Sequence, residues 1–330
     1  MTTDSTQLVA RKSSDKSSAQ DLVETRRAPA RVCRRAFRVL DAAAVFLGIA
    51  VFALTQAGVL AQGYVALTLV LFFACSVRKD GTLAWLLITL GMTLFLALRA
   101  RADTAGFPLH TEDLQRLEVF LFFGAYPSRR LQEWFFSPGQ PGPEDYIALG
   151  VYLSYFVVPY IVLYVVWLVR PQLTFRFSFL LVCTLLLGVA AYALLPATPP
   201  WLASRHPGLA HVWRIIAVVG QSVSPEAYAE IYNRIGDANP TAALPSLHFA
   251  ITCIVYLFAR GAGRWWRTLG LAYMIAMAFA LVYLGEHYVV DLILGGILAW
   301  LVWRFGSRYA DIVARAVGER PGPRCVSPSR

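Results

Sequence analysis

Six apolar segments, each long enough to cross a bilayer, limit the folds open to this chain more than any other feature. They cover about 39–61, 82–98, 146–169, 177–196, 245–262 and 268–285, and two shorter segments follow the same pattern at about 63–77 and 288–304. Roughly 20 apolar residues span the hydrocarbon core as a helix. With 57% hydrophobic and 15% charged residues, the chain is too apolar for a soluble domain of its length. We therefore expect an all-α, polytopic membrane helical bundle with eight spans.

The distribution of Lys and Arg gives the expected orientation. If the eight spans alternate, 22 of the 30 basic residues fall in the terminal segments and connections of one side. Cytoplasmic connections carry such an excess, so both termini should be cytoplasmic, with 99–145 and 197–244 outside. Topology then explains most of the net charge of +10. The charge alone gives no support for a nucleic-acid partner.

Two histidines, His248 and His287, each open an apolar segment on the predicted outer side. Asp291 follows His287 by four residues, so its carboxylate can reach the imidazole on the same helix face. Ser246 precedes His248, and its hydroxyl together with helix-start amides can bind an oxyanion. A single histidine at a helix end is usually structural. Two histidines at one site can divide the roles of nucleophile and general acid. Because the site is expected on the outer side, its substrates should be lipids of the outer leaflet rather than cytoplasmic nucleotides.

Both outer connections carry basic residues that could contact an anion. The second contains Arg205, Arg214 and Arg234, which form either an anion-binding surface or an ordinary solvated loop. The first combines aromatic residues with Arg129 and Arg130, which suits helices in the headgroup region. That region is either a packing cap or a lipid-entry surface.

Three motifs resemble the type-2 phosphatidic acid phosphatase superfamily, within it the branch of inositol phosphorylceramide synthase and its bacterial relatives. The likeness covers roughly 110–305. It rests on Pro245-Ser246-Leu247-His248, on His287-x-x-x-Asp291 and on the Pro-rich turn at 196–201. We therefore expect four segments: a disordered basic cytoplasmic tail at 1–38, N-terminal transmembrane helices at 39–100, a membrane domain at 101–306 that the resemblance implies is catalytic, with a six-helix core, and a cytoplasmic tail at 307–330.

The resemblance also implies the role of each site residue. His287 would be the nucleophile that forms a phosphohistidine, Asp291 would orient it, and His248 would protonate the leaving oxygen. Ser246 would hold phosphoryl oxygens, with no metal and no cofactor. The phosphate-binding cations of the family pattern are absent: Leu163 and Ala280-Leu281 stand in their places. Arg205, Arg214 or Arg234 should replace them, with Arg205 the first choice.

The expected activity is transfer of a phosphoryl-linked lipid headgroup at the extracytoplasmic face, with a polar alcohol such as inositol as acceptor. The expected partners are a phospholipid or lipid phosphate and membrane lipids. A lipid phosphate phosphatase would use the same residues and is the main alternative. A non-catalytic lipid-binding scaffold would also explain the missing cations. A transporter with a His287–Asp291 proton relay would require charges within several spans, and few are present.

Overall fold

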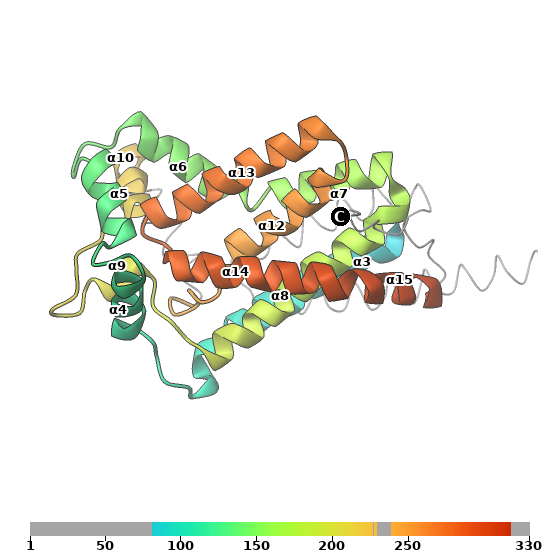
Figure 1. Cartoon of the computed structure of the whole chain (residues 1–330), viewed down its shortest axis with the longest axis horizontal. Coiled ribbons are helices and arrows are strands. Elements are labelled where there is room, and N and C mark those ends of the chain that lie inside the picture. The colour runs from blue at the N-terminus through green and yellow to red at the C-terminus, as the bar shows by residue number, and fades with distance from the viewer. Residues whose placement is uncertain (1–80, 227, 230–238, 318–330) are drawn as a thin grey trace, which may run out of the picture. The chain divides into compact units, whose positions relative to one another are not determined.

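The structure, a computed structural model, describes residues 81–226, 228–229 and 239–317, all within one compact unit, Ala53–Arg330. Every regular element in these ranges is a helix (Figure 1), which confirms the predicted all-α class. The predicted tail 1–38, the segments 39–61 and 63–77, and Arg234 lie outside the described residues. The eight-span count and the domain limits therefore stay predictions.

The helices follow one another with short connections, apart from the two long ones predicted to lie outside. In chain order they are α3 (Thr82–Arg99), η1 (Ala102–Ala105), α4 (Glu112–Leu121), α5 (Pro127–Phe135), α6 (Pro143–Ser154), α7 (Val158–Val169), η2 (Pro171–Leu173), α8 (Thr174–Leu194), α9 (Pro200–Ala203), α10 (Ile215–Val223), α12 (Leu247–Arg260), α13 (Arg264–Tyr283), α14 (Val289–Leu301), the π-helical turn η3 (Val302–Gly306) and α15 (Ser307–Ala316).

Three described helices are long and apolar enough to cross a membrane: Pro171–Leu194, Arg264–Tyr283 and Val289–Ala316. The α6–α7 pair makes a fourth if it counts as one bent span. Two further helices, α3 and α12, are apolar but shorter. Together these six elements coincide with the six apolar segments that the sequence places in the described ranges, so the chain is a membrane protein of helical type.

The segment 146–169, predicted as one span, is broken in the structure. Helix α6 ends at Ser154, α7 begins at Val158, and their axes differ by 50°. Pro159 explains the break, because it has no N–H to donate and its ring crowds the carbonyl four residues earlier. The break turns the aromatic residues Tyr155 and Phe156 toward α12.

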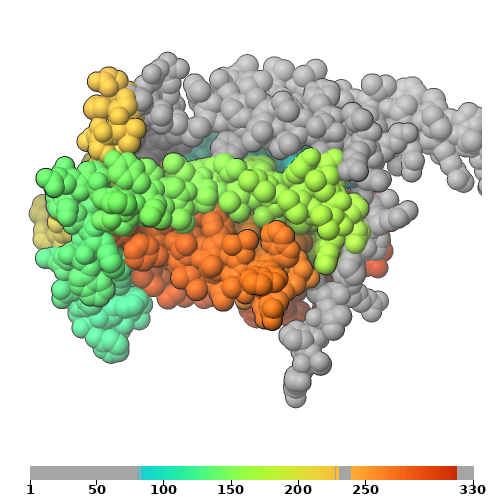
Figure 2. Space-filling view, turned by 90° about the horizontal axis from the view of Figure 1, so that it is seen from above, coloured from blue at the N-terminus to red at the C-terminus, as the bar shows by residue number. Residues whose placement is uncertain are grey.

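Helix α12 occupies the centre of the catalytic part of the bundle. It packs against both α13 and α14, while α8 packs against α3. Helix α6 packs against α13, and α7 packs against α8 and α12; Figure 2 shows the outer face of this pair. Glycine allows the closest approach: a Cβ on Gly295 of α14 would lie 2.4 Å from the backbone oxygen of Ser246. A larger residue at this position would push the start of α12 away from α14.

The two long connections meet at one end of the bundle. Helices α4 and α5 come from the first, α9 and α10 from the second, and all four gather near the start of α14 (Figure 1). Backbone bridges join His110 to Ala197 and Ala197 to Ala242. The connections predicted to share the outer side therefore lie together, as a common side requires.

A buried ion pair holds α8 against α15. Arg176 is 4% exposed and donates from Nη2 to both carboxylate oxygens of Asp311, at 2.6 and 2.7 Å. The last span, predicted to end near residue 304, continues as helix through α15 to Ala316. Arg176 is therefore part of the packed interior rather than of a solvated loop.

Candidate active site

The first histidine lies in the first turn of α12. Ser246 is the N-cap of this helix, and its hydroxyl oxygen accepts the amide N–H of Phe249 at 3.4 Å. A serine cap of this kind satisfies one of the free amides at a helix start. The Ser246 amide itself donates to the backbone oxygen of Asp291 at 3.0 Å. This bond joins the starts of α12 and α14, so His248 is held beside the turn that carries His287.

The second histidine lies just before α14 and is held by its own helix. His287 Nδ1 is 3.2 Å from Oδ2 of Asp291, the contact expected from the four-residue spacing. The same carboxylate oxygen accepts the Tyr288 amide N–H at 2.9 Å, and Asp291 is fully buried. A carboxylate on Nδ1 orients the ring and stabilises positive charge on it. The other ring nitrogen, Nε2, is left for chemistry.

Glycine is required in the turn that leads into His287. Gly285 has a φ of 78°, and a Cβ there would lie 2.7 Å from the backbone oxygen of Trp213. Two long-range bonds fix the same turn: the Gly285 oxygen accepts the Trp201 amide at 3.1 Å, and the Tyr283 hydroxyl donates to Asp145. Asp145 also caps α6 by accepting the Gly142 amide at 2.8 Å. The nucleophile candidate is thus carried by a rigid turn.

The two histidines face one another in a largely aromatic surrounding. Their ring centroids are 5.6 Å apart, and His287 is 4% exposed. His248 packs against Tyr152 at 4.9 Å, Tyr155 at 4.2 Å and Phe156 at 6.0 Å between centroids. Its Nε2 is buried and has no hydrogen-bond partner among the described residues. An imidazole nitrogen in this state can exchange a proton with a bound substrate.

This arrangement supplies the parts needed for covalent phosphoryl transfer. One imidazole is oriented by a carboxylate, as a nucleophile requires, and a second lies within reach of the same substrate atom. No cluster of three or more His, Cys, Asp or Glu suited to a metal occurs within the described ranges.

Residues 112–305, more than half of the chain, match the PAP2 superfamily. The chain belongs to this family. A phosphoinositol dihydroceramide synthase of Bacteroides thetaiotaomicron is 28% identical over 258 residues, which cover 73% of this chain and 82% of that protein. No solved structure matches the chain. The predicted likeness to the inositol phosphorylceramide synthase branch is confirmed, and this PAP2 protein is an enzyme of the phosphatase or phosphotransferase type.

Two of the arginines predicted to replace the missing cations stack on one tryptophan. The guanidinium of Arg214 lies 4.0 Å from the ring centroid of Trp201, and that of Arg205 lies 5.0 Å from it. Arg214 also donates from Nε to Oε1 of Glu286 at 2.9 Å, next to His287. Arg205 is exposed. Whether either binds phosphate stays a prediction.

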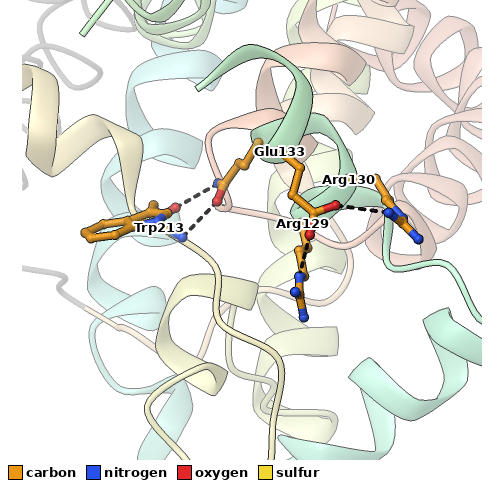
Figure 3. Close-up of polar contacts among 5 residues, drawn as sticks. Arg129, Arg130, Glu133 and Trp213 are labelled. Atoms are coloured by element: carbon orange, nitrogen blue, oxygen red, sulfur yellow. Dashed lines mark hydrogen bonds and ion pairs between the residues drawn. The ribbon is translucent and has the colours of Figure 1, made fainter. Parts of the chain in front are cut away.

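The remaining cationic candidates, Arg129 and Arg130, lie on α5, and both form an ion pair with the same glutamate. Glu133 accepts from Arg129 Nε at 2.8 Å and from Arg130 Nη1 at 3.1 Å (Figure 3). The hydrogen bond from Arg129 lowers the pKa of Glu133. Gln132 joins the same helix to the backbone N–H and oxygen of Trp213, at 2.8 and 2.9 Å. Helix α5 therefore supports the second connection and directs its two arginines toward Glu133.

A buried carboxylic acid that the sequence analysis did not single out lies beside α14. Glu118 of α4 is fully buried against the first amides of α14, and burial raises its pKa to about 8. Tyr126 and Tyr288 stack beside it with centroids 6.3 Å apart. Glu118 lies within electrostatic range of Asp291. Its position on the inward face of an outer helix is the signal that could have identified it.

A second residue missed at first is Arg99, the last residue of α3. Its charge acts on His248 and on the phenols of Tyr155 and Tyr192. It precedes the region of family likeness at 110–305 and is the first residue of the predicted outer connection 99–145. A basic residue that ends an apolar segment on the predicted outer side was the available signal.

Proposed function

We propose that this enzyme transfers a phosphoryl-linked headgroup between a membrane lipid and an alcohol through a phosphohistidine at His287. The observation that carries the proposal is the geometry of three residues: the 3.2 Å contact of His287 Nδ1 with Asp291, and the 5.6 Å separation of the two imidazole rings. Membership of the PAP2 superfamily and the synthase relative support lipid phosphoryl chemistry in general.

The reaction proceeds in two balanced steps. In the first, the lone pair of His287 Nε2 attacks phosphorus, the P–O bond to the lipid alcohol breaks, and His248 gives the leaving oxygen its proton. In the second, His248 takes the proton of the acceptor hydroxyl, the acceptor oxygen attacks phosphorus, and the P–N bond breaks. Asp291 stabilises the positive charge that the His287 ring carries in the intermediate.

The surroundings of His248 favour an alcohol over water as acceptor. Rings of Tyr152, Tyr155 and Phe156 cover the imidazole and leave its Nε2 buried. Excluding bulk water protects a reactive intermediate from hydrolysis. A polar alcohol such as inositol is our proposed acceptor. The relative's name joins phosphoinositol with dihydroceramide, so a lipid hydroxyl is the second acceptor to test.

We place the site at the extracytoplasmic face, with both termini in the cytoplasm. His287 directly precedes α14, whose start lies where the helices of the long connections gather, and the Ser246–Asp291 backbone bond holds the start of α12 beside it. The long connections hold few of the 30 basic residues. The excess of Lys and Arg marks the cytoplasmic side.

The test is a product analysis with purified protein in phospholipid vesicles. Labelled phosphatidylinositol or phosphatidic acid is incubated alone, with free inositol, or with a ceramide. A headgroup found on an added alcohol supports the transferase, and the alcohol that receives it identifies the acceptor class. Release of free phosphate or phosphoinositol alone would show a hydrolase instead.

Two variants make the product analysis specific. His287→Ala should abolish every product, whereas His211→Ala should leave activity unchanged, because His211 is an exposed histidine at the same end that packs on Trp213. If the wild-type protein gives no product with any lipid, the enzymatic proposal fails in favour of a lipid-binding scaffold. If His287→Ala retains activity, the assignment of the nucleophile fails.

A further inference from the structure

The active site needs positive charge near its phosphoryl group, and the family's usual cations are missing from this chain. Histidine rings and amides neutralise the charge of a transferring phosphoryl group incompletely, so sites of this kind use fixed cations. Ala280 and Leu281 stand where one of them is expected. Another residue must supply that charge if the proposed function is correct.

Arg99 is a candidate for this cation, because it ends α3 beside the segment that leads into the His248 turn. It ends α3, is half-buried, and is the cation among the described residues whose charge acts on His248. It also acts on Tyr155, which packs on His248 at 4.2 Å, and on Tyr192, a buried residue of α8. Three aromatic groups, from α12, α8 and the break between α6 and α7, therefore lie within electrostatic range of its guanidinium.

The backbone holds Arg99 at the entrance to the His248 turn. Its carbonyl oxygen accepts the side-chain amide of Asn239 at 3.1 Å. The other end of that side chain accepts the amide and the hydroxyl of Thr241, at 3.0 and 2.8 Å. Asn239 is 3% exposed. The end of α3 is thus fixed to the segment that enters α12, without any use of the arginine side chain.

The guanidinium of Arg99 has no partner among the residues that the structure describes. Across residues 81–226 and 239–317 its side chain forms no hydrogen bond or ion pair, although it is half-buried. A partly buried, unpaired cation is costly unless a ligand compensates it. The nearby cation Arg214 has Glu286 at 2.9 Å, and Arg129 has Glu133 at 2.8 Å.

We propose that Arg99 binds the phosphoryl oxygens of the substrate at the His248–His287 site, in place of the cations that the family pattern lacks. The proposal rests on the proposed function and adds a residue from outside the family match at 112–305. The ligand class is a phosphate ester of a lipid. A guanidinium can hold two non-bridging oxygens at once, whereas an ammonium acts as a single point of charge. Arg99 makes no covalent bond and moves no proton.

The test compares Arg99→Ala, Arg99→Lys and the control Arg101→Ala. Arg101 lies two residues further on, is exposed, and bonds only within its own helix end. Two quantities are measured: kcat/KM for the lipid substrate, and the dissociation constant of inorganic phosphate from the purified protein. We expect Arg99→Ala to lower kcat/KM by about a hundredfold and to weaken phosphate binding by at least tenfold. Arg99→Lys should recover part of both, and Arg101→Ala should match the wild type.

Added guanidinium distinguishes a binding role from a structural one. It should restore part of the activity of Arg99→Ala, a gain that a folding defect would not show. If Arg99→Ala keeps more than half of wild-type kcat/KM and binds phosphate normally, the inference is wrong while the proposed function stands. If the wild type turns over no lipid, the function fails, and the phosphate titration still decides whether Arg99 binds a phosphate group.

Discussion

Replacing Glu118 by glutamine should make the protein more tolerant of alkaline pH. Glu118 is fully buried against the first turn of α14, and burial raises its pKa from 4.5 to about 8. The folded protein therefore holds this proton more tightly than the unfolded chain. As pH rises above about 4.5, the unfolded chain loses its proton first and is stabilised, so the folded state loses stability until the native group ionises near pH 8.

The size of the effect follows from the two pKa values. Between about pH 5.5 and about pH 8.5, the free energy of unfolding of the wild type should fall by about 3 kcal/mol through this one group. That corresponds to roughly 6–12 °C in the unfolding temperature of a domain of this size. Glu118→Gln has no proton to lose, so it should lack this part of the decline.

Thermal unfolding in detergent, followed by circular dichroism at several pH values, measures the difference. The matched control is Glu112→Gln, at an exposed position of the same helix, where Glu112 pairs with Arg116 at 2.7 Å. It should follow the wild-type pH profile. Equal slopes for wild type and Glu118→Gln between about pH 5.5 and 8.5 would show that Glu118 is ionised in the folded protein at low pH, and the reasoning would be refuted.

Three further predictions concern catalysis, packing and orientation. Asp291→Asn should lower kcat by roughly a hundredfold while leaving lipid binding intact, because it misorients the nucleophile; an unchanged kcat in the vesicle assay would contradict this. Arg176→Met should lower the free energy of unfolding by about 3–5 kcal/mol, because it leaves Asp311 without its partner, and the double change Arg176→Met with Asp311→Leu should recover much of the loss. A cysteine at Ser222 should react with a membrane-impermeant reagent in intact cells and one at Ala262 should not; the reverse labelling would place the site in the cytoplasm.

The local features of the site followed from the sequence because they depend on short spacings. The four-residue separation of His287 and Asp291 predicted the observed contact, and Ser246 before an apolar segment predicted a helix start. The apolar segments gave the helical class for the same reason. Periodicity and spacing are properties that neighbouring residues determine among themselves.

Features that depend on contacts between distant segments were missed or incomplete. Glu118 is buried only because α4 folds onto the start of α14, and Arg99 lies within electrostatic range of His248 only because α3 ends near the segment that leads into α12. Arg176 stands between two apolar segments in the sequence, yet in the structure it is buried and paired with Asp311, 135 residues further along the chain. Pro159 is a local sequence signal for the helix break at Tyr155, but the continuous apolar pattern of 146–169 predicts a single unbroken span.

The most direct test of the central claim is to trap the covalent intermediate. Purified protein is mixed with phospholipid labelled in its phosphate, quenched in alkali within one turnover, digested, and analysed by mass spectrometry. We expect an acid-labile, alkali-stable phosphoramidate on His287, present in the wild type, formed more slowly in His248→Ala and absent from His287→Ala. Turnover with no label on the protein, or with label on any residue other than His287, would contradict the mechanism.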